Sequence, residues 1–307
     1  MQPLVVVLGP TGSGKTDLAL SIAQLFDGEL VGCDSLQIYR HFNVGTAKTP
    51  TSERRGVPHH LIDLIDPDGT FTAGDYARAG RKALNEIAGR GKLPVVAGGT
   101  GFYLRALLEG LFPGPERDED LRERLSRRER ARPGFLHRLL RRLDKPTAAR
   151  IHLHDARKLI RAIEVSMLRR TPMSEQFQAG RDRLTGYRIL KVGLAPPRAR
   201  LHQRIDERLA RMFESGLLEE VRQILAQGFP RTSKPFESLG YKEALAVVEE
   251  RMTPDEALAA AQLATRQYAK RQMTWFRREK DVVWMEGFGG DSEVRENTLA
   301  LVKSALA

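Results

Sequence analysis

Short apolar runs alternate with amphipathic segments over the first third of the chain. Apolar runs with the length of buried strands lie at residues 4–8, 29–33 and 94–97, and one more follows much later, at residues 189–194. Between them, residues 15–26 and 72–90 carry apolar side chains at helical spacing. Such alternation is typical of parallel strands joined by crossover helices. The pattern therefore predicts an α/β fold, with a parallel sheet core flanked by helices.

The pattern changes near residue 114, where a helical, arginine-rich region begins and continues to about residue 187. Residues 116–170 hold 17 Lys+Arg and 9 Asp+Glu, so most of the net charge of +11 lies there. An ordinary solvated helix usually mixes the two signs more evenly, although that reading stays open. Because a strand follows this region, we interpret residues 114–187 as an inserted all-helical domain. Residues 1–113 and 188–307 would then form one core.

Two further helices are predicted in the second part of the core. The first places Leu201, Ile205 and Leu209 on one face, with Arg204 and Arg208 on a neighbouring face. From the bare pattern, these arginines could equally be solvated. The second covers about residues 254–278 and carries Tyr268, Trp275 and Phe276. Aromatic residues at helical spacing favour a core role over stacking on bases.

A phosphate-binding loop follows the first strand directly. Its pattern G-x-x-x-x-G-K-[ST] is formed by Gly9, Pro10, Thr11, Gly12, Ser13, Gly14, Lys15 and Thr16. Glycines let the backbone amides face a phosphate, Lys15 supplies a charge, and Thr16 offers a hydroxyl to Mg²⁺. A turn without a ligand would leave Lys15 and Thr16 unexplained. The sequence therefore predicts that this loop binds a diphosphate.

The usual second acidic ligand of an ATP-hydrolysing site is missing from the sequence. The candidate strand at residues 93–97 ends on Gly98 and Gly99 instead of an aspartate. The nearest acid is Asp34, at the end of the second predicted strand. We interpret Asp34 as a general base that faces the site, and the alternative is that it caps a turn before Ser35.

The remaining composition restricts the cellular compartment and the kinds of site that we expect. The single cysteine, Cys33, excludes a disulfide framework and suits a reducing cytoplasm. No apolar run approaches membrane-spanning length, and the chain begins at its first strand, so we expect neither a membrane anchor nor a signal peptide. His59 and His60 are adjacent without apparent partners, which favours a loop over a metal site.

Several motifs in one order resemble those of the tRNA dimethylallyltransferases. They are the phosphate loop, Asp34-Ser35-Leu36-Gln37-Ile38-Tyr39, Gly45-Thr46-Ala47-Lys48, Pro58-His59-His60-Leu61-Ile62-Asp63, Gly98-Gly99-Thr100-Gly101-Phe102-Tyr103, Gly240-Tyr241-Lys242-Glu243 and the run from Tyr268 to Phe276. The resemblance spans nearly the whole chain, and its main departure is Gly12, where alanine is commoner. It implies a P-loop NTPase-like core whose loop binds dimethylallyl diphosphate in place of ATP.

The resemblance also implies a reaction and its participants. A dimethylallyl group would pass to N6 of the adenosine 3′ of the anticodon, position 37, in tRNAs that read codons beginning with U. The catalytic residues would be Asp34, Thr16 and Arg208, with Mg²⁺ on Thr16. The residues implied in tRNA binding are Asp34, Ser35, Leu36, Gln37, Thr100, Arg122, Arg157, Lys158, Leu159, Ile160, Arg161, Glu237, Ser238, Leu239, Gly240, Tyr241 and Lys242. The basic insertion would grip the anticodon stem-loop, and we expect a cytoplasmic monomer.

Three other functions remain open on the residues alone. An adenylate isopentenyltransferase would share the fold but would have little use for the basic insertion. A small-molecule kinase would bind ATP in the same loop. An RNA-binding module would carry the loop as a remnant. Prenylated adenosine formed from dimethylallyl diphosphate and tRNA would separate these possibilities.

Overall fold

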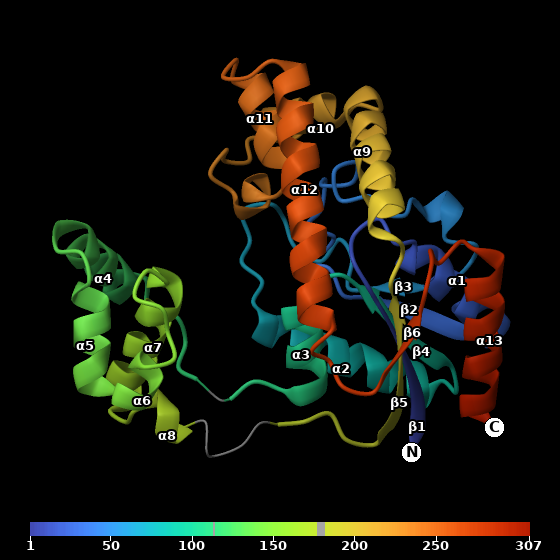
Figure 1. Ribbon diagram of the computed structural model, residues 1–307, viewed down its shortest axis with the longest axis horizontal. Coiled ribbons are helices and arrows are strands. Elements are labelled where there is room, and N and C mark those ends of the chain that lie inside the picture. The colour runs from blue at the N-terminus through green and yellow to red at the C-terminus, as the bar shows by residue number, and fades with distance from the viewer. Residues whose placement is uncertain (113, 177–181) are drawn as a thin grey trace. The chain divides into compact units, whose positions relative to one another are not determined.

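The computed structural model describes residues 1–112, 114–176 and 182–307 of the protein (Figure 1). It consists of two compact units, each with its own core. Unit 1 is Met1–Leu108 together with Leu184–Ala307, and unit 2 is Glu109–Arg183. The bounds of unit 2 thus lie a few residues before the 114–187 expected for the insertion.

Unit 1 is built on one parallel sheet. Its described strands are β1 (Gln2–Leu8), β2 (Gly28–Gly32), β3 (His59–His60), β4 (Leu93–Gly98), β5 (Tyr187–Leu194) and β6 (Val282–Met285). They are ordered β3-β2-β4-β1-β5-β6, and every neighbouring pair is parallel. β1 is central and almost entirely buried, as an apolar run covered on both faces should be. The predicted fold class is confirmed.

Helices cover both faces of this sheet. They are α1 (Lys15–Leu25), α2 (Ala73–Gly89), α3 (Gly101–Glu109) and α13 (Ser292–Leu306), with the short helix η1 (Thr51–Glu53) in the loop before β3. Val5 and Val7 of β1 pack with Leu18 and Ile22 of α1 and Val294 of α13. Side chains alternate across a strand, so the residues between them face the opposite side of the sheet. There, α2 packs against β2 and β4.

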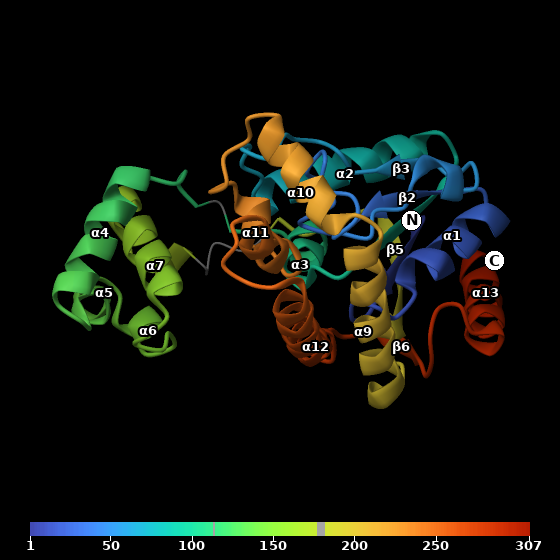
Figure 2. The same cartoon turned by 90° about the horizontal axis from the view of Figure 1, so that it is seen from above.

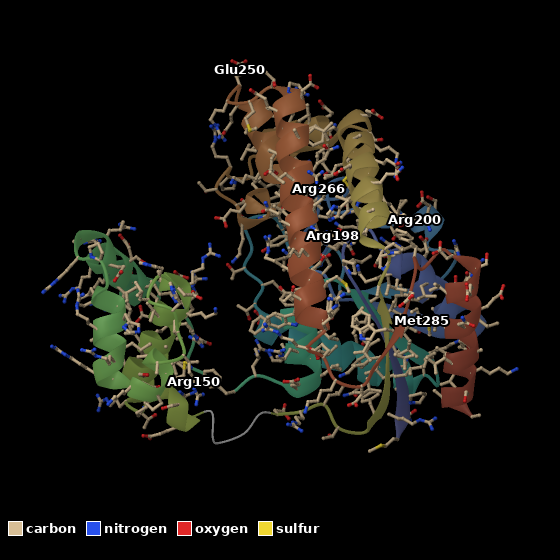
Figure 3. The ribbon with its side chains drawn as sticks, viewed as in Figure 1. Arg150, Arg198, Arg200, Glu250, Arg266 and Met285 are labelled. Carbon is tan, nitrogen blue, oxygen red and sulfur yellow. The ribbon has the colours of Figure 1, made fainter. Side chains whose placement is uncertain are left out.

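A second group of helices stands beside the carboxyl ends of the strands (Figures 1 and 2). It contains α9 (Arg198–Glu214), α10 (Leu217–Ala226), η3 (Lys234–Glu237), α11 (Tyr241–Val248) and α12 (Pro254–Phe276). The predicted apolar face of α9 is confirmed, because Leu201, Ile205 and Leu209 are buried in one cluster with Phe236 and Tyr241. α12 packs against both α9 and α11. An ion pair of 2.5 Å between Arg266 of α12 and Asp206 of α9 adds to this packing. Arg266 is labelled on α12 in Figure 3.

Unit 2 is helical in its described part. Its helices are α4 (Glu119–Ala131), α5 (Phe135–Leu143), α6 (Lys145–Ala148), α7 (Ala156–Arg169) and α8 (Met173–Gln176). Leu125 of α4, Leu136 and Leu140 of α5, and Leu159 and Ile163 of α7 form a common core. Acidic side chains cap three of these helices, because Asp118, Asp144 and Asp155 accept backbone N–H groups of the first turn.

The sequence prediction is wrong at His59 and His60, which form strand β3 at the edge of the sheet rather than a loop. Two residues are too few to produce a periodic signal, and their register is set by β2, where Leu30 pairs with His59. His60 Nε2 lies 2.6 Å from Glu29 Oε2, and the ring of His59 approaches the carbonyl of Val57 through Nδ1 at 2.8 Å. Both histidines thus have roles inside the fold.

Candidate functional site

The phosphate loop lies between β1 and α1, at the carboxyl edge of the sheet. Gly12 and Gly14 adopt φ values of 82° and 83°, a left-handed conformation that strains other residues. Gly14 also approaches Gly289 so closely that an added Cβ would lie 3.0 Å from the backbone nitrogen of Gly289. α1 begins at Lys15, so the positive end of the helix faces the loop. The loop is therefore shaped to hold an anion.

Two basic side chains meet at this loop. Lys15 Nζ donates to Pro10 O at 2.7 Å, and Arg208 Nη2 of α9 donates to Thr11 Oγ1 at 2.6 Å. Burial and the nearby Arg208 lower the pKa of Lys15 to about 8, while Asp34 opposes this shift. Burial likewise lowers the pKa of Arg208, whose Nε is buried without a partner among the described residues. A dianionic or trianionic ligand would relieve the repulsion between these two cations.

Asp34 lies after β2, beside the turn that follows β4. The two turns are joined because Thr100 N–H donates to Cys33 O at 3.1 Å and Ser35 N–H donates to Thr100 Oγ1 at 3.1 Å. Asp34 Oδ1 accepts Leu36 N–H at 2.8 Å, so the turn-capping interpretation is confirmed. This bond uses one carboxylate oxygen and holds the group in place. It is compatible with the role of a base at the other oxygen.

Aromatic rings line the surroundings of Asp34. Burial raises the pKa of Tyr268 to about 12, and Asp34 contributes to the shift, which places this phenol near the carboxylate. Tyr103 stacks on the buried Tyr76, with ring centroids 4.4 Å apart. Phe276 is buried, as predicted, whereas Trp275 is half-buried beneath the guanidinium of Arg105, 4.5 Å from the ring centroid. Burial, with a contribution from Asp34, also raises the pKa of Tyr103, so the phenols of Tyr268 and Tyr103 lie within electrostatic reach of the candidate base.

Gln272 of α12 is the residue of this site whose role the sequence reasoning missed. Its side chain is buried, and its Oε1 accepts Thr11 N–H at 2.8 Å while its Nε2 donates to Gly99 O at 2.8 Å. It lies on the buried face of α12 with Ala269 and Phe276. A glutamine at that apolar spacing was the available signal, because a buried amide needs polar partners.

Thr16 has an environment that suits a metal ion carried by a substrate. Its side chain is exposed in the first turn of α1. In the part of the chain that the structure describes, no three His, Cys, Asp or Glu side chains are grouped so that they could hold a metal ion. Mg²⁺ commonly keeps several waters and binds few protein groups plus the phosphates of a ligand. A threonine hydroxyl at the phosphate loop fits that mode.

The remaining predicted residues of unit 1 fall into exposed and buried groups. Gln37 Nε2 donates to Thr46 O at 3.1 Å and so supports the loop that precedes η1. In the segment of residues 237–242, the side chains of Glu237 and Lys242 are exposed. Tyr241 is buried and binds Glu220 and the backbone N–H of Gly45. Tyr241 thus supports the fold beneath its neighbours.

In unit 2, two of the three predicted arginines contact one buried carboxylate. Glu164 is fully buried and accepts Arg122 Nε at 2.6 Å, Arg122 Nη2 at 2.7 Å, Arg161 Nη1 at 2.5 Å and Asp118 N–H at 3.0 Å. Burial alone would raise the pKa of Glu164, but these hydrogen bonds hold it at about 2. Each guanidinium remains partly exposed, with 21% and 34% of the Arg122 and Arg161 side chains accessible.

The other predicted residues on α7 divide by helical face. Arg157 and Lys158 are exposed, and Lys158 pairs with Asp155 at 2.6 Å. Leu159 and Ile160 are buried in the core of unit 2. Arg150, before α7, adds another exposed cation to this unit (Figure 3). The exposed surface of unit 2 is therefore rich in guanidinium groups, which suit phosphate recognition.

The helices of the described residues are unlike membrane-spanning segments. None of them combines the length and the apolar character that crossing a bilayer requires. This agrees with the hydropathy of the sequence.

Comparison with known proteins gives a consistent result over the whole chain. A family model described as IPP transferase matches residues 37–279. The tRNA dimethylallyltransferase of Solibacter usitatus is 58% identical over 99% of both chains, and that of Koribacter versatilis is 54% identical over 98% of both. Among solved structures, a full-length tRNA isopentenylpyrophosphate transferase from Bacillus halodurans matches with a TM-score of 0.73 at 33% identity, covering 99% of this chain and 96% of that one. A eukaryotic dimethylallyltransferase that acts on tRNA gives a TM-score of 0.84 at 26% identity, covering 99% and 78%.

Proposed function

The chain belongs to the IPP transferase family, and from this premise we propose that its phosphate loop binds dimethylallyl diphosphate as the prenyl donor. The enzyme transfers a dimethylallyl group to an adenosine of tRNA. We infer that the acceptor atom is N6 of the adenosine 3′ of the anticodon, in tRNAs that read codons beginning with U. The family relationship disfavours the kinase and the free RNA-binding module. The basic insertion disfavours an adenylate isopentenyltransferase, which would modify free nucleotides.

The observation that carries this proposal is the pairing of two cations with one carboxylate at the same site. Lys15 and Arg208 lie at the phosphate loop, and Asp34 is near enough to influence the pKa of both. In the reaction, a bond forms between N6 and C1 of the dimethylallyl group, and the bond from C1 to the diphosphate oxygen breaks. The diphosphate departs with that electron pair. Lys15 and Arg208 stabilise its growing charge, which is worth roughly 10²–10³ in rate for one well-placed donor.

Asp34 supplies the second requirement of the reaction. The lone pair of N6 is delocalised into the adenine ring, so N6 must lose a proton as the new bond forms. Asp34 accepts this proton, while its bond to Leu36 N–H fixes its orientation. Thr100, which is joined to the Asp34 turn through Ser35, contacts the target nucleotide. The adenosine must leave its stack to reach this site, at a cost of a few kcal/mol.

Thr16 would hold Mg²⁺ together with oxygens of the diphosphate. The metal supplies charge neutralisation when bound, and Thr16 fixes its position at the start of α1. Unit 2 would hold the anticodon stem-loop through the phosphates and the shape of the RNA, with Arg157 and Lys158 exposed for direct contact. We infer that the enzyme works in the cytoplasm as a monomer.

The direct test uses purified protein, dimethylallyl diphosphate, Mg²⁺ and an anticodon stem-loop with adenosine 3′ of the anticodon. Mass spectrometry of the digested RNA should show one adenosine heavier by a dimethylallyl group, at that position. A stem-loop with guanosine at that position is the matched control and should remain unmodified. Modification of free AMP at a comparable rate would contradict the tRNA acceptor. Consumption of ATP without prenyl transfer would contradict the proposal that dimethylallyl diphosphate is the donor substrate.

A further inference from the structure

We infer that Gln272 is a positioning residue, which fixes the phosphate loop relative to the turn that carries Asp34. This inference deepens the proposed function and rests on it. The two substrates would bind to different segments of unit 1. The donor diphosphate would bind at residues 9–16, and the acceptor nucleotide would lie beside Asp34 and Thr100. A single side chain from α12 joins the two segments.

Both polar atoms of the Gln272 amide take part in this bridge, and the Tyr268 hydroxyl is a further hydrogen-bond neighbour of the same side chain. Oε1 accepts the backbone N–H of Thr11, and Nε2 donates to the carbonyl of Gly99, each at 2.8 Å. Only 6% of the residue is exposed, so water cannot readily replace either partner. The opposite orientation of the amide would set a donor against Thr11 N–H and an acceptor against Gly99 O. The orientation is therefore dictated by its two partners.

Hydrogen bonds continue the bridge to the candidate base. Gly99 precedes Thr100, whose Oγ1 accepts Ser35 N–H at 3.1 Å, and Ser35 follows Asp34. A Cβ on Gly99 would lie 2.4 Å from Gln272 Nε2 and 3.9 Å from Lys15 Nζ. The amide of Gln272 is thus packed against the turn, and the ammonium group of the phosphate loop is next to it.

Thr11 is held from a second direction as well. Its backbone N–H binds Gln272 of α12, and its hydroxyl accepts Arg208 Nη2 of α9 at 2.6 Å. One loop residue is therefore fixed by two helices that approach from different parts of the sequence. Group transfer between two bound substrates is sensitive to their separation, and a displacement of about 1 Å can cost about 10²-fold in rate. Gln272 is placed to set this separation without touching either substrate's reacting atoms.

The first experiment compares Gln272→Met and Gln272→Glu with the wild type. Methionine keeps the length of the side chain and removes both hydrogen bonds. Ionised glutamate retains an acceptor for Thr11 N–H but has no proton to donate to Gly99 O, so this variant is assayed at a pH at which the carboxyl is ionised. We expect single-turnover transfer at saturating donor and stem-loop RNA to fall about 10- to 100-fold in both variants. The affinities for inorganic diphosphate and for the stem-loop should change by no more than about threefold.

Gln262→Met is the matched control on the same helix. Gln262 Nε2 donates to Asp206 O at 3.1 Å, so the control also removes a hydrogen bond that holds α12. We expect the control to lower the midpoint of thermal unfolding and to leave the single-turnover rate within about twofold of the wild type. A rate loss in the control equal to that of Gln272→Met would overturn the inference, because general loosening of α12 would then explain both.

Gly99→Ala alters the same contact, between Gln272 and Gly99, through a change at Gly99. Its methyl group should displace the Gln272 amide, since the backbone of Gly99 is not left-handed and admits alanine. The double variant with Gln272→Met should be no slower than the slower single variant, as expected for two changes in one contact. If the fold-losses in single-turnover rate of the two single variants multiply in the double variant, the inference that Gln272 acts through Gly99 is wrong.

Other outcomes separate this inference from the proposed function. If wild-type protein transfers the prenyl group and Gln272→Met does so at the same single-turnover rate, the positioning role is wrong and the function stands. If diphosphate affinity falls in proportion to the rate, Gln272 merely shapes the phosphate loop and the inference is again wrong. If the wild type does not prenylate the stem-loop, the proposed function itself fails. Should the Gln272 variants not fold, Gly99→Ala alone decides by the same readouts.

Discussion

Lys15 shows how one residue can be tuned by its surroundings before any ligand binds. Its ammonium donates to the carbonyl of Pro10, and burial together with Arg208 lowers its pKa to about 8. The motif identifies this lysine from sequence alone, because the phosphate loop is a local pattern of eight residues. Its perturbed pKa could not be predicted, because it depends on burial in the folded protein and on Arg208 of α9, far along the chain. Gln272 was missed for the same reason, since it contacts Thr11 across 261 positions of sequence.

The lowered pKa of Lys15 predicts how diphosphate binding depends on pH. A bound diphosphate favours the charged ammonium, so above pH 8 the free protein must take up a proton when it binds. Affinity for inorganic diphosphate should therefore fall by up to about tenfold per pH unit as the pH rises above 8. Calorimetry in buffers with different ionisation enthalpies would measure this uptake. Lys15→Arg should bind without the uptake, and an uptake that persists in Lys15→Arg would assign it to another group.

The same shift predicts a change in the stability of the free protein. The pKa of Lys15 is below the ordinary 10.5 of the unfolded chain, so the unfolded state binds more protons between about pH 8 and 10.5. The contribution of Lys15 to the free energy of unfolding should thus rise with pH through that window. Comparing denaturant unfolding of wild type and Lys15→Met at pH 7.5 and 10 would reveal it. A difference between the two proteins that does not change with pH would contradict the shift.

Asp34→Asn tests the candidate base. Asparagine keeps the shape and can still accept Leu36 N–H, but it cannot take a proton from N6. Single-turnover transfer should fall by about 10²–10⁴, with diphosphate and stem-loop affinities within a few-fold of the wild type. Asp66→Asn, which alters an exposed carboxylate paired with Arg40, is the control and should transfer normally. Near-normal transfer by Asp34→Asn would reject the base.

At the scale of elements, the long periodic segments were predicted well and the shortest strands were not. Strands β1, β2 and β4 are mostly buried apolar runs, whereas β5 is buried only in its last three residues. The predicted bounds of all four strands agree with the observed ones to within two residues at each end. β3 and β6 escaped notice because two and four residues at the sheet edges carry little pattern. These two strands form because β2 and β5 pair with them through backbone hydrogen bonds, and such pairing depends on the tertiary fold rather than on the local sequence.

Within unit 2, the packing of α4 against α7 includes an ion cluster around Glu164, which a count of charges in the sequence does not reveal. α7 brings this carboxylate beneath Arg122 and its own Arg161, so two of the predicted RNA-binding arginines also serve the fold. The sequence indicated the basic surface but not this internal counter-ion. Neutralising Arg122 or Arg161 would leave Glu164 buried without a full set of partners, so a loss of RNA affinity in either variant would have to be separated from a loss of stability.

Glu164→Ala should therefore destabilise unit 2 by about 3–5 kcal/mol, as expected when one partner of a buried ion cluster is removed. The wild type should lose the contribution of Glu164 in acid, because its folded pKa of about 2 lies below the ordinary 4.5. That contribution is complete above about pH 4.5 and disappears as the pH falls toward 2. Hydrogen exchange of α4 and α7 in the full-length protein would measure both effects. Protection in Glu164→Ala equal to the wild type would contradict them.

At the scale of the whole molecule, charge and chemistry lie in different units. The candidate base and the phosphate loop belong to unit 1, whereas residues 116–170 in unit 2 carry most of the net positive charge. The sequence predicted this division from composition, because an arginine-rich run needs no folding to be recognised. Which arginines are free for RNA required the structure. Among those named from the sequence, Arg157 is exposed with no ion pair found in the described part of the chain.

The division predicts that RNA affinity can be weakened without affecting the donor site. Arg157→Ala combined with Lys158→Ala should lower the slope of log affinity for tRNA against log salt by about 0.7 to 0.9 for each RNA phosphate that the variant no longer neutralises. Diphosphate affinity should stay within about twofold of the wild type, because Debye screening limits the reach of surface charges. Arg295→Ala combined with Lys303→Ala removes the same charge from exposed positions on α13 of unit 1 and is the control. Equal slopes in the two double variants would mean that only net charge matters.

The hydrogen bond from Leu184 N–H to Leu108 O, 2.9 Å long, joins the two places where the chain leaves and re-enters unit 1. The ends of unit 2 are therefore held together by the fold of unit 1, whatever lies between them. Because the entropy of closing a loop grows only with the logarithm of its length, residues can be added to or removed from this insertion at little cost to unit 1. An evolving lineage could thus change the length and surface of unit 2 repeatedly while the phosphate loop and the Asp34 turn are inherited unchanged.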